Sequence, residues 1–226
     1  MNRGALKIIG FCLAALVLAG VVQFLRLRAD NQRIARDFVE SVASLRQQQA
    51  AQNAALQARF DALDLDHALE ASTLATPDGV RRGRELLANF RGLLAERERL
   101  AADQTAAGHK LIEQLPAGRM RAEALRGAAS AATRTHKLQD DLSHAETANA
   151  DAIQAILDWA DRNHALLHLR GDKLMVDGQR PLDELNGLEA VLVKSGQDVQ
   201  GILAQGHAIE ANSGRELGRL RDEMRQ

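Results

Sequence analysis

The chain contains only three prolines, Pro77, Pro116 and Pro181, and they separate long stretches that repeat apolar residues at helical spacing. Proline cannot donate a backbone hydrogen bond and collides with the preceding helical turn, so it is confined to helix starts and breaks. Between the prolines, apolar residues recur every three or four positions, which is the period of a helix with one buried face. The sequence therefore predicts four long helices, at about residues 27–66, 77–115, 119–165 and 181–224.

The composition agrees with long packed helices. Alanine, leucine, arginine, glutamine and glutamate dominate, and all five are good helix formers. Thr76, Pro77 and Asp78 form a typical helix start, with a capping side chain, a proline in the first helical position and a carboxylate at the positive end of the helix dipole. Long helices joined by short connections pack antiparallel, which favours an up-down four-helix bundle.

One stretch between the third and fourth predicted helices does not have a helical pattern. The runs Leu166–Leu169 and Lys173–Val176 are short and apolar, with Gly171 between them and Gly178 after them. Two such runs around a glycine-containing turn predict a small β-hairpin at about residues 166–177. A two-stranded hairpin is marginally stable alone, so we expect it to pack on the ends of helices.

The N-terminus holds the most apolar part of the chain. The run Ile8–Leu25 has eighteen residues without a charge, and Arg3 and Lys7 precede it. A helix of this length covers roughly 27 Å, close to the hydrocarbon thickness of a bilayer. The pattern predicts a membrane anchor over residues 1–26 that contacts the lipid bilayer through Ile8 to Leu25. A cleaved signal peptide ending near Ala19 is the alternative, although the apolar run continues beyond that site.

The predicted fold class is therefore all-α, with an N-terminal transmembrane helix followed by a long antiparallel up-down four-helix bundle and a small β-hairpin between helices 3 and 4. Residues 1–26 form the anchor and residues 27–226 the extramembrane bundle. Arginines just after the apolar run favour a cytoplasmic domain, but long domains translocate largely regardless of charge. We expect a single-pass protein of the cell inner membrane with the bulk of its chain in the periplasm.

Charge and motifs exclude several function classes. The net charge is −1, with 29 basic and 30 acidic residues, so the clustered basic excess of a nucleic-acid-binding protein is missing. The sequence has no nucleophile elbow, phosphate loop or dinucleotide fingerprint. Asp161, His164 and His168 have the spacing of metal ligands on a helix, but His168 falls in the predicted hairpin. We therefore expect no enzyme activity, no catalytic residue, no cofactor and no bound metal.

The hairpin region resembles part of a known group of proteins. The run His168–Val176, followed by Pro181–Asn186, is similar to the late hairpin-then-helix of uncharacterised bacterial envelope lipoproteins that have a helical domain. Cys12, the single cysteine, follows the bulky Phe11 and lacks the lipid-attachment box of those proteins. The resemblance implies a location in the cell envelope and no activity.

These observations predict a non-enzymatic, membrane-anchored helical bundle of the cell envelope that acts as a structural or partner-binding module. The partner would be another envelope protein, and a homo-oligomer is compatible with the sequence. The partner-binding residues would be the apolar side chains of the hairpin, because binding residues concentrate in irregular segments held on rigid scaffolds: Leu167, Leu169, Leu174 and Val176. The alternative is an extracytoplasmic ligand-sensing bundle that works with a separate signalling subunit.

Overall fold

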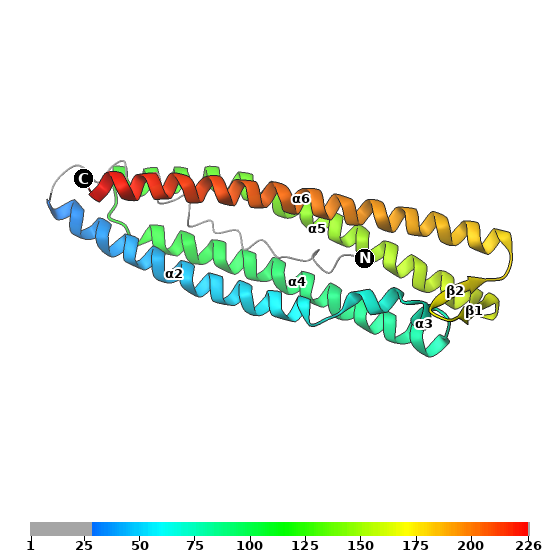
Figure 1. Cartoon of the computed structure of the whole chain (residues 1–226). Coiled ribbons are helices and arrows are strands. Elements are labelled where there is room, and N and C mark those ends of the chain that lie inside the picture. The colour runs from blue at the N-terminus through cyan, green and yellow to red at the C-terminus, as the bar shows by residue number, and fades with distance from the viewer. Residues whose placement is uncertain (1–28, 226) are drawn as a thin grey trace. The chain divides into compact units, whose positions relative to one another are not determined.

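The computed structural model describes residues 29–225 of the chain, with the side chains of most residues between 34 and 208. This part is mostly helical (Figure 1). Its elements follow one another in the order α2 (Ala29–Asp61), η1 (Leu65–Leu69), α3 (Ala71–Leu74), α4 (Pro77–Glu113), α5 (Arg119–Asn163), η2 (His164–Leu166), β1 (Leu167–Arg170), β2 (Lys173–Val176) and α6 (Gln179–Arg225).

The fold class predicted from the sequence included a transmembrane helix, and the structure contradicts that fold class. Between residues 29 and 225, no helix combines the length and the apolar character needed to cross a membrane. Each of these long helices has charged residues along its exposed side, as expected for helices that bury one stripe and solvate the rest. The predicted single-pass span, Ile8–Leu25, lies outside the described residues.

The prediction of one long four-helix bundle also needs correction, since the chain packs as two compact units. Within the described residues, unit 1 comprises 56–96 and 141–202, and unit 2 comprises 29–55, 97–140 and 203–225. Sequence periodicity located the helices but could not divide them, because α4, α5 and α6 each contribute to both units without a break in helical pattern.

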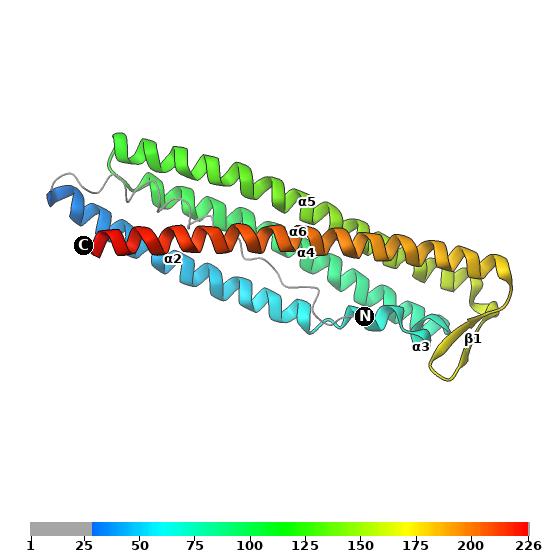
Figure 2. The ribbon, with the colours of Figure 1, turned by 45° about the horizontal axis from the view of Figure 1, so that its top comes forward.

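Unit 1 is built around the first half of α4 and the second half of α5. Trp159, Leu157 and Leu87 are fully buried there, and the rings of Phe60 and Phe90 meet edge to face with centroids 5.8 Å apart. Helix α6 adds the buried Leu185 to the same unit. The hairpin joins the end of α5 to the start of α6, and Figure 2 shows it as a ribbon that leaves the helices and returns to them.

Unit 2 has its own apolar core where α2 meets the end of α4 and the start of α5. Six buried side chains form it: Phe38, Val42, Ile112, Leu115, Ala124 and Ala128. The connection from α4 to α5 turns at Gly118, whose φ is +144°. Arg121 covers the end of α4, because its guanidinium donates hydrogen bonds to the backbone oxygens of Leu115 and Glu113. Carbonyls at a helix end have no partner within the helix, so these bonds define where α4 stops.

Candidate functional site: the hairpin of unit 1

The four hairpin residues singled out from the sequence share one face of the two-stranded sheet. The antiparallel register pairs Leu167 with Val176 and Leu169 with Leu174. Residues directly opposite each other on neighbouring strands point to the same side, and so do residues two apart on one strand. Leu167, Leu169, Leu174 and Val176 therefore form a continuous apolar face, which we call the hairpin face.

The turn at the tip of the hairpin sets this register. Gly171 has φ +63°, while no positive φ is found at Asp172, as in a type II′ turn with glycine in its first central position. A shift of one residue would move every side chain to the opposite face of the sheet. The turn therefore determines that the leucines and valine, and not His168 and Met175 between them, make up the hairpin face.

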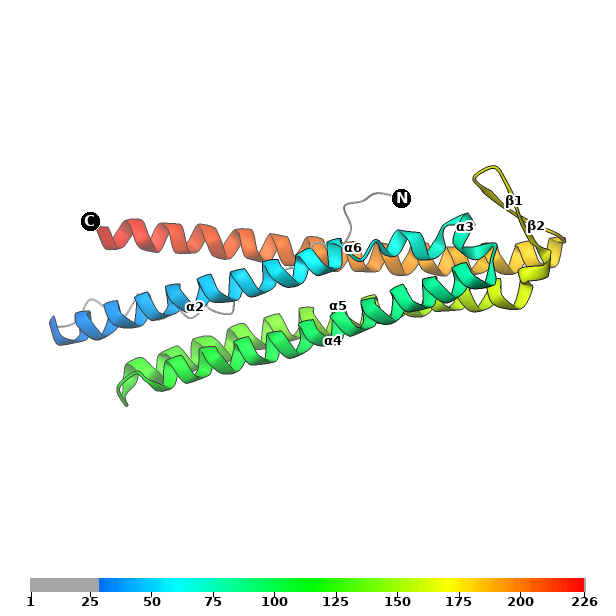
Figure 3. The same cartoon turned by 90° about the horizontal axis from the view of Figure 1, so that it is seen from below.

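Burial changes along the hairpin face from its base to its tip. At the base Leu167 is only 8% exposed, whereas at the tip Leu169 is 46% exposed, and Leu174 and Val176 are half-buried. Helix α3 contacts both strands, and its Leu74 is buried. Figure 3 shows the hairpin projecting away from α5 and α6 with α3 at its side. Leu167 at the base is thus packed as part of the core of unit 1, whereas at the tip Leu169 is exposed and its partner Leu174 is half-buried.

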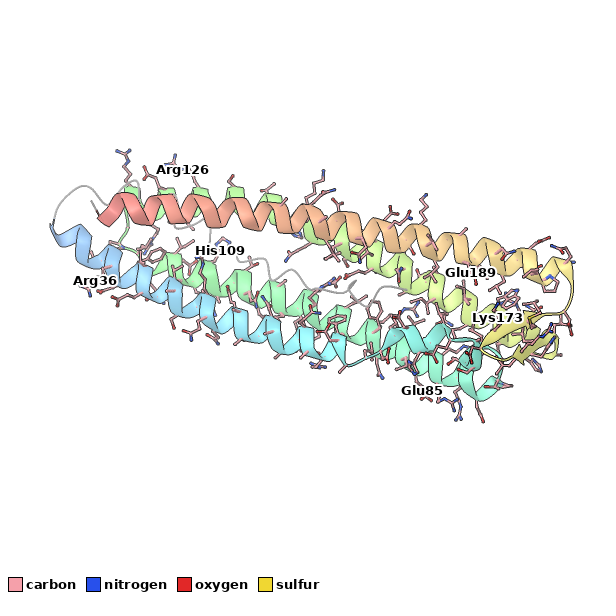
Figure 4. The ribbon with its side chains drawn as sticks, viewed as in Figure 1. Arg36, Glu85, His109, Arg126, Lys173 and Glu189 are labelled. Atoms are coloured by element: carbon pink, nitrogen blue, oxygen red, sulfur yellow. The ribbon has the colours of Figure 1, made fainter. Side chains whose placement is uncertain are left out.

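The opposite face of the hairpin carries three polar or basic residues and the half-buried Met175, which pairs with His168. His168, Arg170 and Lys173 are exposed on it, and Figure 4 labels Lys173 at this place. The His168 Nδ1 atom lies 3.7 Å from the Asp177 Oδ2 atom. The hairpin therefore has one continuous apolar face and one mainly polar face, on which Met175 is the apolar residue.

Further exposed apolar side chains flank the hairpin. Leu166 in η2 is 36% exposed and Leu182 in the first turns of α6 is 37% exposed. Together with Leu169 they are three of the five exposed large hydrophobic residues in the part of the chain with described side chains, and all five belong to unit 1. The exposure of Leu166 and Leu182 could not be predicted from the sequence, because hydropathy alone does not distinguish a buried leucine from an exposed one.

A charged network near the end of α5 was also missed. Arg84 in α4 donates hydrogen bonds to Asp158 Oδ1 at 2.8 Å and to Asp161 Oδ2 at 2.9 Å. The pKa of Arg84 is raised, first by the bond to Asp158 and then by the bond to Asp161. Burial alone would raise the pKa of Asp158, but hydrogen bonds from Arg84 and Gln154 lower it below its usual value. The arrangement holds α4 against α5 and favours the charged forms of Arg84 and Asp158.

The residues with metal-ligand spacing are not brought together around a common point. The Asp161 carboxylate pairs with Arg84, and the His164 Nδ1 atom lies 3.0 Å from the Asp161 backbone oxygen. His168 is on β1 and faces Asp177. Within residues 29–225, no group of three or more histidine, cysteine, aspartate or glutamate side chains has an arrangement that could hold a metal ion.

In comparisons with known proteins, no family model, curated protein or solved structure matches this chain. The similarity of the hairpin region to envelope lipoproteins therefore stays an expectation from the sequence. What the protein does has to be inferred from the geometry of its own residues, and in unit 1 the hairpin face is the surface that best supports an inference.

Proposed function

We propose that this protein is a non-enzymatic, partner-binding helical protein of the cell envelope, and that its partner contacts the tip of the hairpin face. The observation that carries the proposal is the exposure of Leu169 on a face whose base, at Leu167, is buried. If the hairpin served only as a cap on unit 1, we would expect its apolar residues to be covered along the whole face. An apolar surface left uncovered is typical of an interaction site.

The supporting scaffold suits a binding role. The hairpin is held by α3 at its base and by its type II′ turn at its tip, so little conformational entropy would be lost when a partner binds. A two-stranded hairpin would be marginal without such support. The exposed Leu166 and Leu182 extend the apolar surface beside the hairpin.

The charged groups of unit 1 support a structural role better than a catalytic one. The pKa of Arg84 is raised and the pKa of Asp158 is lowered, and the two groups are hydrogen-bonded to each other. A catalytic acid or base needs a pKa moved toward the working pH, whereas this pair is moved away from it. Both groups therefore act as fixed charges between two helices.

The envelope location rests on the sequence before residue 29. The uncharged run Ile8–Leu25, with Arg3 and Lys7 before it, has the pattern that directs a chain to the export machinery. The hairpin would then meet its partner outside the cytoplasm.

Site-specific photo-crosslinking tests the proposal. A photoreactive amino acid placed at Leu169 should capture one defined partner in living cells, and Leu174→Asp in the same chain should remove the cross-link. Val193 on α6 is the matched control, since it is 58% exposed in the same unit but lies outside the hairpin. Equal capture from positions 169 and 193, or capture that Leu174→Asp leaves unchanged, would contradict a specific hairpin site.

A further inference from the structure

We infer that the partner of the hairpin face is an extended protein segment that alternates apolar and acidic residues and pairs as a third strand along the outer edge of β1. This inference rests on the proposed function and names the chemistry of the partner. Three features of the hairpin carry it: the burial of its two strands, the direction of their backbone groups and the charges on its mainly polar face.

The two strands of the hairpin differ in burial, and β1 is the open one. Every residue of β1 from His168 to Arg170 is exposed, whereas Leu174, Met175 and Val176 on β2 are half-buried. A strand that is exposed along most of its length can be approached from the side that faces away from its neighbour. The outer edge of β1 is therefore the accessible edge of the sheet.

Backbone groups without a partner point to this edge. The Asp177 N–H donates to the Leu166 backbone oxygen at 2.9 Å, and residues that bond to β2 alternate along β1 from that point. The N–H and C=O of Leu169 and the C=O of Leu167 consequently point away from β2, while the Leu167 N–H donates to the His164 backbone oxygen. No described residue is a hydrogen-bond partner of the three outward groups. Such an edge is a template for an added strand.

The mainly polar face of the hairpin is positively charged beside the same edge. Arg170 lies directly opposite Lys173, and both side chains are exposed. Asp177 lies beside His168, and no described carboxylate is within salt-bridge distance of Arg170 or Lys173. Like charges directly opposite each other destabilise a strand pair, so an acidic side chain on a third strand would offset their repulsion.

The alternation of the partner follows from the pleat of the sheet. Residues of a third strand opposite Leu167 and Leu169 would lie on the hairpin face, and the residues between them would lie on the face of Arg170. Apolar side chains suit the first set of positions and acidic side chains the second. The result is an extended segment in which the two kinds of residue alternate.

A second copy of this chain suits the edge less well. The strand β1 reads LHLR and contains no acidic residue. Pairing of β1 with β1 of another molecule would therefore place basic side chains beside basic side chains on the polar face, which is unfavourable.

Synthetic peptides test the inference on the purified full-length protein. A fluorescently labelled peptide of about eight residues that alternates valine and glutamate should bind in an anisotropy titration. The matched peptide that alternates valine and lysine should bind about tenfold more weakly or worse. Only every second residue of a strand turns its N–H toward a given neighbour. Methylation of one alternate set of peptide nitrogens should therefore abolish binding, and methylation of the other set should leave it.

Variants of the protein assign the binding to β1. Leu169→Pro removes the outward N–H without removing a bond to β2, and it should lower the affinity about tenfold or more. Arg170→Glu should remove the preference for glutamate over lysine in the peptide. Arg99→Glu, at an exposed position of α4 in unit 2, is the control and should change neither affinity. Circular dichroism checks that each variant is folded, and the methylated peptides test the backbone bonds if Leu169→Pro is not.

The outcomes separate this inference from the proposed function. Specific capture of a partner from position 169 in cells, together with no binding of the valine–glutamate peptide, would overturn the strand pairing and leave the proposed function standing. Loss of specific capture would overturn both. Equal affinities for the glutamate and lysine peptides, equal effects of the two methylation patterns, or a cross-link from position 169 to a second copy of this chain would also overturn the inference.

Discussion

Two glycines of α4 lie close to neighbouring segments of unit 1, and at Gly79 the neighbouring backbone leaves no room for a side chain. A Cβ atom at Gly79 would lie 2.2 Å from the Thr73 backbone oxygen. At Gly83 it would lie 2.8 Å from the Leu157 Cδ2 atom and 3.1 Å from the Ala68 backbone oxygen. The segment from η1 to α3 thus packs directly on the start of α4, and this packing positions α3 under the hairpin.

We expect Gly79→Ala to destabilise the protein by roughly 1–3 kcal/mol, because the backbone must shift to admit the methyl group. Gly92→Ala on the same helix is the matched control, since a Cβ atom there would meet no atom within 4 Å. That substitution should stabilise the protein by up to about 1 kcal/mol, through the higher helix propensity of alanine. Urea denaturation of both variants measures the difference. Equal effects of the two substitutions would contradict the close approach at Gly79.

The Arg84 network predicts a loss of stability in acid. The pKa of Asp158 is lower in the folded chain than in the unfolded chain, so its contribution is present above the unfolded pKa and disappears as the pH falls through the folded value. Arg84 and Asp158 are 37% and 40% exposed, so solvent screening limits the contribution to about 1 kcal/mol or less.

We therefore expect Asp158→Asn to lower the free energy of unfolding at pH 7 and to have little effect near pH 2. Glu40→Gln, in the exposed pair with Arg36 on α2, is the control and should change stability less at pH 7. Urea denaturation at the two pH values gives the comparison. A cost of Asp158→Asn that is the same at both pH values would show that the network does not act through the carboxylate charge.

At the scale of elements, the hairpin shows which structural features can be predicted from the sequence and which cannot. Its two apolar runs and Gly171 were sufficient to predict the strands and the turn, and the structure confirms a hairpin there. The burial gradient from Leu167 to Leu169 could not be predicted, because it depends on how the rest of unit 1, including the neighbouring α3, packs around the hairpin. The sequence predicts no helix between residues 66 and 77, where α3 lies, since four residues are too few for a helical period to be recognised.

Helix ends were harder to predict than helix interiors. The first predicted helix extended to residue 66, but α2 ends at Asp61, and Asp64 takes the left-handed conformation with φ +44°. Aspartate can adopt this conformation, although nothing in a single sequence requires it. Helix α6 begins at Gln179, so Pro181 lies in its first turn and not at its start. A proline is tolerated there because the backbone N–H groups of the first turn have no hydrogen-bond partner within the helix.

The hairpin face should separate into a structural and a binding part. Leu167→Ala should cost about 2 kcal/mol or more of unfolding free energy, since it removes a buried side chain. Leu169→Ala should cost less than about 0.5 kcal/mol, because that side chain is already largely exposed. If the proposed function is right, Leu169→Ala weakens capture of the partner even though it leaves the melting temperature unchanged. Destabilisation by Leu169→Ala as large as that by Leu167→Ala would mean that the whole face is core.

At the scale of the whole molecule, the sequence predicted the helical class but not the division of the chain. Each unit collects segments that are far apart in the sequence, such as residues 56–96 and 141–202 in unit 1. Apolar periodicity continues through α4, α5 and α6 without marking a boundary, because both units use the same helical repeat.

The last prediction concerns where the chain resides. A C-terminal alkaline phosphatase fusion, made in a Gram-negative host, should be active, since this enzyme folds only after export. The uncharged run Ile8–Leu25 should direct that export, and the arginines that follow it should not prevent translocation of a long domain. Leu16→Arg places a charge in the run and should abolish phosphatase activity, whereas Leu16→Ile should retain it. An inactive wild-type phosphatase fusion, with a fluorescent green fluorescent protein fusion at the same position, would place the domain in the cytoplasm and end the envelope proposal.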